Sequence, residues 1–82
     1  MNLWIKFFAK PSAPNVTRYP IPYPTGELGT LKDFATLEDA RKTAFADADK
    51  IKAHSIIIES EDGIAVSERW AREGAGWKRE NA

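Results

Sequence analysis

The residues between Thr36 and Trp70 constrain the fold more than any other part of the chain, because a capped helix pattern is followed there by two strand patterns. The Thr36 hydroxyl can accept a hydrogen bond from the Asp39 amide, and the Asp39 carboxylate can bond the Thr36 amide, as in a capping box. Apolar side chains then recur with the helical period, at Leu37, Ala40, Ala44, Ala48 and Ile51. Because most of this stripe is alanine, we expect a helix that lies close against the element it covers.

Phe45 lies outside the apolar stripe, about 100° around the helix from the side that carries Leu37. We expect another segment of the same domain to cover this ring. A contact surface for a partner is the alternative.

Two strands are predicted after the helix. Residues 55–60 contain three consecutive isoleucines, which favour a strand. Glu61, Asp62 and Gly63 predict a three-residue hairpin loop with Gly63 in the left-handed conformation. The strand pairs would be Ser60 with Ile64, Ile58 with Val66 and Ile56 with Glu68, and the side chains facing the helix would be Ile56, Ile58, Ile64 and Val66. A two-residue Asp-Gly turn would move the apolar set of one strand off this shared face, so we choose the longer loop.

The first strand pattern covers residues 3–9 and is apolar on both faces. Leu3, Ile5 and Phe7 share one face, and Trp4, Lys6 and Phe8 share the other. Such a strand is usually central in a sheet or covered on both sides. We expect the helix to cover one of the two faces.

A proline-rich excursion spans residues 10–29 and contains all five prolines of the chain. Proline at alternate positions predicts an extended segment in which Tyr19, Ile21 and Tyr23 remain available as side chains. We expect an ordered arm that packs on Trp4 and Phe8. A mobile loop and a docking segment for a proline-binding groove are the alternatives. Residues 30–34 predict either a short strand or the approach to the helix.

The C-terminal segment mixes basic and aromatic side chains. Gly74 and Gly76 mark a turn, after which residues 77–80 predict a short edge strand. Arginine and lysine side chains beside tryptophans can hold single-stranded nucleic acid, and the residues that would do so are Arg72, Trp77, Lys78 and Arg79. Three glutamates dilute this basic patch; they are Glu68, Glu73 and Glu80. The carboxylates around the hairpin, Glu59, Glu61, Asp62 and Glu68, are interpreted as solvated charges.

These patterns predict a single α+β domain over residues 1–82. The expected order is strand, proline-rich excursion, helix, strand and strand, with a short C-terminal edge strand. One helix would pack on an antiparallel or mixed sheet of three to four strands. The right-handed crossover rule allows the first strand to lie parallel to a hairpin strand.

The composition argues against most catalytic functions. Twelve basic side chains balance twelve acidic ones, which argues against a polyanionic partner held by bulk charge. The chain has no cysteine and a single histidine, His54, so we expect no metal site and no cofactor. The sequence contains neither of the glycine-rich phosphate-binding motifs G-x-x-x-x-G-K-S/T and G-x-G-x-x-G. The sequence therefore predicts a protein that is not an enzyme, has no membrane segment and works in the cytoplasm.

The helix and hairpin motifs resemble those of many short bacterial and phage proteins of unknown function. The matching residues are Phe34-Ala35-Thr36-Leu37-Glu38-Asp39-Ala40, Ile56-Ile57-Ile58, Asp62-Gly63-Ile64, Trp70 and Trp77. In element order and size the chain is also similar to some small phage-encoded anti-CRISPR proteins, which bind a host nuclease complex without catalysing a reaction. The resemblance implies a small cytoplasmic accessory protein that works by binding, and it assigns no functional residue.

We therefore predict non-catalytic binding to a protein partner or to a second copy of the chain. Tryptophan and arginine are the residue types that most often anchor such interfaces. The candidate contact residues are Trp4, Phe8, Tyr19, Tyr23, Phe45, Arg72, Trp77, Lys78 and Arg79. Nucleic-acid binding through the C-terminal segment is the alternative.

Overall fold

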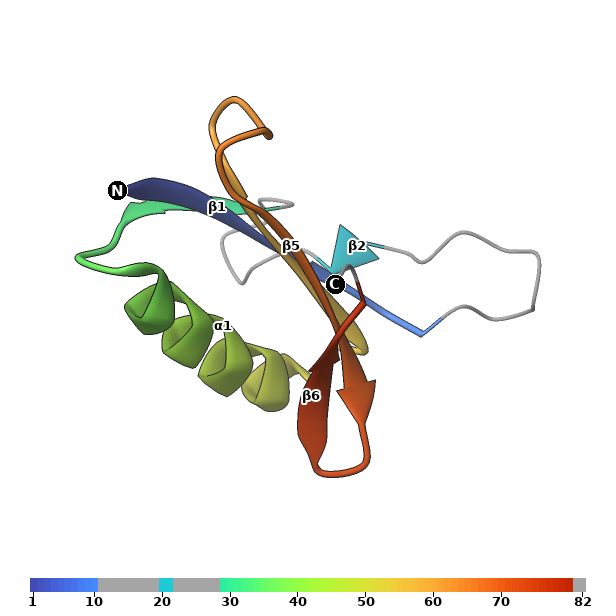
Figure 1. The fold of residues 1–82 in the computed structure, drawn as a ribbon. Coiled ribbons are helices and arrows are strands. Elements are labelled where there is room, and N and C mark those ends of the chain that lie inside the picture. The colour runs from blue at the N-terminus through green and yellow to red at the C-terminus, as the bar shows by residue number, and fades with distance from the viewer. Residues whose placement is uncertain (11–19, 22–28, 81–82) are drawn as a thin grey trace.

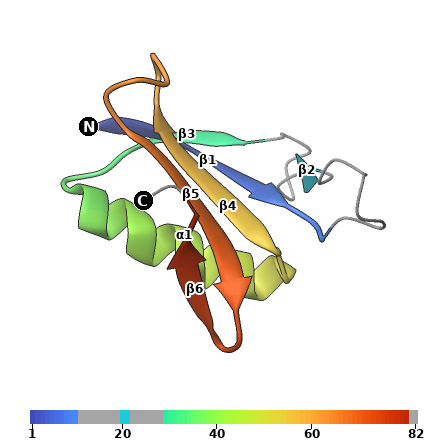
Figure 2. The same cartoon turned by 45° about the vertical axis from the view of Figure 1, so that its right-hand side comes forward.

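The computed structural model describes residues 1–10, 20–21 and 29–80 of the chain (Figure 1). Along the chain, its elements are β1 (Asn2–Phe8), β2 (Pro20–Ile21), β3 (Thr30–Asp33), α1 (Leu37–Ile51), β4 (Ser55–Ser60), β5 (Ser67–Glu73) and β6 (Gly76–Arg79). The helix packs on one face of the sheet, so the predicted α+β class is confirmed (Figure 2). Within the described residues, no helix has the length and apolar character that a membrane span needs.

Strand β1 is central in the sheet, as its two apolar faces predicted. The strand order is β2-β1-β4-β5-β6, and β3 also pairs with β1. Strands β3 and β2 share one side of β1, where β3 pairs with residues 2–5 and β2 with residues 7–8. The sheet has six strands instead of the predicted three to four, because the chain returns twice to β1 between β1 and the helix.

The described strand pairs are all antiparallel, which is the first of the two predicted alternatives, and the parallel arrangement that the crossover rule allowed for the first strand is not the one found. The crossover through α1 begins at β3, which runs antiparallel to β1, and ends at β4, which also runs antiparallel to β1. Strands β3 and β4 are therefore parallel to each other, with β1 between them. Residues 30–33 form a strand, the first of the two alternatives for this segment.

The helix begins with the N-cap that its sequence predicted. The Asp39 amide donates to the Thr36 hydroxyl at 3.1 Å, and Thr36 has the extended backbone of an N-cap. Lys52 ends the helix in the left-handed conformation, with φ of 57°. Three alanines of the stripe are fully buried, namely Ala40, Ala44 and Ala48. Because these side chains are short, α1 lies close to the sheet.

The core lies between α1 and the helix-facing side of the sheet. Its large side chains come from β1, from β4 and from the segment before the helix; they are Leu3, Ile5, Phe7, Phe34, Ile56 and Ile58. Leu37 and Ile51, at the two ends of the helical stripe, are partly buried against this core. The helix-facing sides of β1 and β4 are therefore those that the alternation predicted.

The predicted hairpin register is wrong by two residues. Ile58 pairs with Glu68 and Ile56 with Trp70, so the loop between the strands is longer than three residues. The Asp62 carboxylate accepts hydrogen bonds from the Ile64 and Ala65 amides and from the Ser60 hydroxyl, which stabilises the longer loop. A register shift of two residues keeps Ile56 and Ile58 on the side of the sheet that faces the helix. Ile64, however, lies in the loop outside the core and is 84% exposed.

The C-terminal hairpin agrees with the prediction. Gly74 has a φ of 58°, which only glycine adopts without strain, and β6 follows it as an edge strand. In Figure 1 the β5–β6 hairpin extends past the end of α1, at the opposite end of the sheet from the β4–β5 loop.

Candidate protein-binding surface

The sheet has one face that α1 does not cover, and we call it the open face. Since side chains alternate along a strand, Trp4, Lys6 and Phe8 point to the side opposite the buried Leu3, Ile5 and Phe7. The strand register extends this face across the sheet; its other members include Leu31, Asp33, Ile57, Glu59, Arg69, Ala71 and Lys78. Among the described residues, no helix or strand packs on it.

Four large apolar side chains lie on the open face. Trp4 and Phe8 of β1 and Ile57 of β4 are half-buried. Leu31 of β3, which pairs with Trp4, is 41% exposed. These four side chains form a partly exposed apolar band across three adjacent strands, and apolar patches on a protein surface often mark binding sites.

An ion pair lies between the apolar side chains of this face. The Lys6 Nζ donates to Glu59 Oε1 at 2.7 Å and lies 5.9 Å from the centroid of the Trp4 ring. Gly29 fits beside them because it has no side chain: a Cβ there would lie 3.0 Å from the Lys6 Cγ. The pair neutralises both charges beside the apolar band.

The helix side carries a second aromatic group, which we call the C-terminal cluster; it comprises Phe45, Trp70, Arg72 and Trp77. The Phe45 ring meets Trp70 edge-on at 5.1 Å and stacks on Trp77 at 5.7 Å between ring centroids. The Arg72 guanidinium lies 4.3 Å from the Trp77 centroid and donates to Asp49 at 2.9 Å. The expectation that another segment of the domain covers Phe45 is therefore confirmed.

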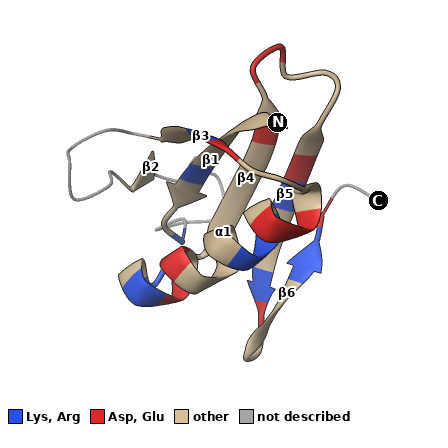
Figure 3. Ribbon diagram, turned by 90° about the vertical axis from the view of Figure 1, so that its left-hand side faces the viewer, with Lys and Arg blue, Asp and Glu red and all other residues tan. Residues whose placement is uncertain are grey.

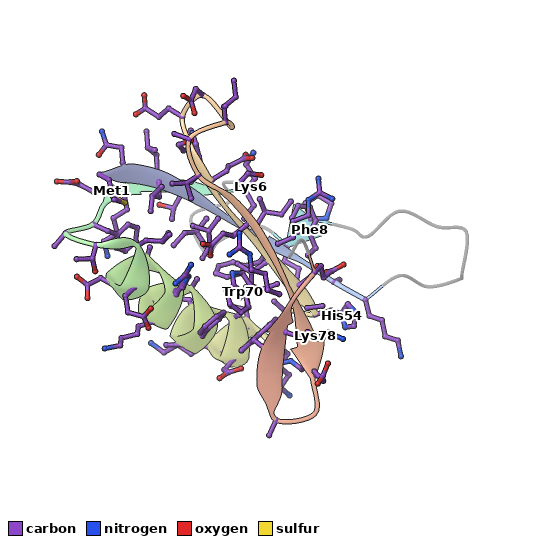
Figure 4. All side chains as sticks on the ribbon, viewed as in Figure 1. Met1, Lys6, Phe8, His54, Trp70 and Lys78 are labelled. Atoms are coloured by element: carbon purple, nitrogen blue, oxygen red, sulfur yellow. The ribbon has the colours of Figure 1, made fainter. Side chains whose placement is uncertain are left out.

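The basic residues of the C-terminal segment are divided between the two faces. Lys78 pairs with Ala71 on the open face, whereas Arg79 pairs with Trp70 on the helix side. Figure 4 shows Trp70 in the space between β5 and α1, with Lys6 and Phe8 on the far side of the sheet from the helix. The four residues of the nucleic-acid alternative therefore do not share one surface. Figure 3 shows both charge signs along the helix and across the sheet.

Glu68 is buried, and its interpretation as a solvated charge is wrong. It is 2% exposed, and its carboxylate accepts hydrogen bonds from both Arg41 Nε and Arg41 Nη2 and from Trp70 Nε1. Arg79 Nη1 lies 3.8 Å away. Hydrogen bonds from Arg41 lower the pKa of Glu68 below its ordinary value, and Trp70 and Arg79 add to this effect against the opposing effect of burial. The ion pair fixes the helix to β5.

Tyr19 and Tyr23 lie outside the described residues. The proline-rich arm expected over Trp4 and Phe8 is described only at β2, which pairs with Phe7 and Phe8 as a short strand. Ile21 of β2 packs against the core cluster. The rest of that prediction lies outside the described residues.

Leu31 and Ile57 were not among the predicted contact residues. Ile57 is the middle residue of the isoleucine run, so strict alternation would have placed it on the face opposite Ile56 and Ile58. Leu31 could have been found only if residues 30–33 had been assigned to a strand beside β1.

Comparisons with protein-family models, with curated proteins and with solved structures find no match for this chain. Among the described residues, no group of three or more His, Cys, Asp or Glu side chains is placed to hold a metal ion.

Proposed function

We propose that this chain is a non-catalytic binding protein and that the open face is its protein-contact surface. The observation that supports this proposal is the one-sided cover of the sheet: α1 buries one face, while Trp4, Phe8, Ile57 and Leu31 lie on the other. Protein interfaces typically have an apolar and aromatic centre with charged groups around it. The open face has apolar side chains around the mutually neutralised Lys6–Glu59 pair, with the exposed charges of Asp33 and Lys78 at its margins.

The partner class and the compartment are also part of the proposal. The resemblance to small anti-CRISPR proteins favours a host nuclease complex as the partner of a phage-type inhibitor. The absence of cysteine in the whole sequence is compatible with the cytoplasm. The proposed partner class and the proposed compartment both rest on the amino-acid sequence.

Nucleic-acid binding through Arg72, Trp77, Lys78 and Arg79 is the less favoured function. Phe45 and Arg72 already occupy the surroundings of the Trp77 ring, so a base that stacked there would have to displace an internal contact. Such binding would weaken strongly with added salt.

Affinity capture with three baits tests the proposal. The baits are the unchanged chain, Leu31→Asp and Ile64→Asp, used in lysate of the bacterium in which the chain acts, with and without nuclease. Leu31 lies on the open face, whereas Ile64 is an exposed aliphatic side chain in the β4–β5 loop, so the two variants introduce the same charge at different surfaces.

We expect a discrete protein partner, either foreign or a second copy, to be retained by Ile64→Asp and lost by Leu31→Asp. Equal capture by both variants, or capture of nuclease-sensitive material only, would contradict the proposed surface. Circular dichroism of each bait checks that the fold is intact.

A further inference from the structure

We propose that the open face binds a second copy of this chain, in a symmetric dimer that pairs the two open faces. This inference rests on the proposed function, because it names the partner of the same surface. A two-fold axis makes such an interface self-complementary: if one residue of the first copy contacts another residue of the second, the reverse contact forms as well.

Two exposed charges lie at opposite corners of the open face. Asp33 is on β3, on one side of β1, and pairs with Asn2 where β1 begins. Lys78 is on β6, at the opposite edge of the sheet. In the strand register it lies in one row with Ala71, Ser55 and Phe8, the last residue of β1. A two-fold axis along the other diagonal of the face places Asp33 of each copy beside Lys78 of the other. Both ion pairs then form at once.

Both corner charges have a partner within the chain, but each of these ion pairs is exposed to solvent. Asp33 contacts the Met1 ammonium at 2.8 Å, and Lys78 approaches Glu73 at 3.9 Å, but the Asp33 and Lys78 side chains are 80% and 71% exposed. Exposed ion pairs of this kind contribute little to stability, so exchanging them for contacts with a second copy has a small cost.

The middle of the face does not oppose this pairing. Lys6 and Glu59 neutralise each other at 2.7 Å, so the apolar band of one copy meets no uncompensated charge there. The whole chain has a net charge of zero, so two copies approach without net repulsion. Trp4, Phe8, Ile57 and Leu31 would supply the apolar contact.

The size of the face predicts a weak dimer. Five adjacent strands at a spacing of ~4.8 Å and a length of ~20 Å present roughly 500 Å² per copy. A total near 1,000 Å² belongs to the smallest specific interfaces, so we expect dissociation at micromolar concentrations.

Sedimentation equilibrium over a dilution series tests the dimer, with charge reversal at the two corners. The variants are Asp33→Lys, Lys78→Glu, the double variant with both changes, and Leu31→Asp. Lys42→Glu on the exposed side of α1 is the matched control for a charge reversal away from the open face.

We expect the unchanged chain and Lys42→Glu to dimerise with the same dissociation constant. Each corner variant replaces two attractive contacts with repulsive ones and should raise that constant about tenfold. The double variant restores opposite charges and should return it to within about threefold of the original. Leu31→Asp should remain monomeric.

A monomer at every concentration, corner variants that match the control, or a double variant no tighter than either single one would overturn the dimer. The capture experiment separates the two proposals. A monomeric chain whose foreign partner is lost only by Leu31→Asp would refute the dimer and leave the protein-binding surface standing. If Leu31→Asp changes neither self-association nor capture, both proposals fail.

Discussion

Replacing Arg41 with leucine should strongly destabilise the fold, because it leaves the Glu68 carboxylate buried without its main partner. Arg41 supplies two of the three hydrogen bonds to a residue that is only 2% exposed. Removing one partner of a buried ion pair costs about 3 to 5 kcal/mol. Trp70 and Arg79 stay near the carboxylate, and the Arg41 side chain is itself 26% exposed. We therefore expect a loss in the free energy of unfolding of about 2 to 3 kcal/mol.

Urea unfolding at pH 7, followed by far-UV circular dichroism and tryptophan fluorescence, measures this loss. For a domain of this size it corresponds to a fall in Tm of roughly 10 to 20 °C. The double variant Arg41→Leu/Glu68→Leu leaves no uncompensated carboxylate, so it should regain most of the stability and lie within about 1.5 kcal/mol of the original chain.

Glu38→Gln is the control for the pair. Glu38 contacts the same guanidinium at 3.4 Å, but its side chain is 63% exposed, so we expect a change below about 0.5 kcal/mol. A cost for Arg41→Leu as small as that of the control would refute the reasoning. A double variant less stable than Arg41→Leu alone would refute it as well.

Four further predictions concern the same domain. The folded-state pKa of Glu68 is depressed, so the stability that the ionised carboxylate contributes is present above the ordinary glutamate pKa, near 4.5, and is lost as the pH falls through the folded-state pKa. Thermal melts between pH 6 and 3 should therefore show a smaller fall in Tm for Glu68→Gln than for the original chain. Equal falls in Tm would contradict this. Lys52→Gly should raise the free energy of unfolding in urea by about 0.5 to 1 kcal/mol, because Lys52 has a φ of 57° at the helix end, whereas Thr36→Ala should lower it by about 1 kcal/mol. Trp77→Ala removes the stacking of the indole on the Phe45 ring, so it should lower the free energy of unfolding by about 2 kcal/mol and change the near-UV circular dichroism spectrum. Unchanged stability would mean that Trp77 contributes only to binding a partner.

The helix and the core-facing residues were predictable because their signals are local. Thr36 and Asp39 mark the cap within one turn, and the alanine stripe needs only the helical period. The first strand was recognised as central from its own alternation. The hairpin register was not predictable in this way, because it depends on the Asp62 side chain closing a longer loop in place of a bulge.

The candidate site was only partly predictable, because its members come together across the sheet. Trp4 and Phe8 were predicted as contact residues from β1 alone, whereas Leu31 joins them only when β3 pairs with β1. The burial of Glu68 depends on Arg41, which lies 27 residues earlier in the chain. No local pattern in β5 distinguishes such a carboxylate from a solvated one.

The indole resonances of the three tryptophans test the central claim most directly, because Trp4 reports the open face, whereas Trp70 and Trp77 report the cluster on the helix side. The measurement is a ¹H–¹⁵N spectrum of the labelled chain, recorded while the chain is concentrated and while a captured partner is added. The claim that the open face binds protein predicts that the Trp4 indole signal shifts in at least one titration, while Trp70, which donates to Glu68, and Trp77 stay in place. A shift confined to Trp77, or a Trp4 signal that stays fixed while binding occurs, would contradict it.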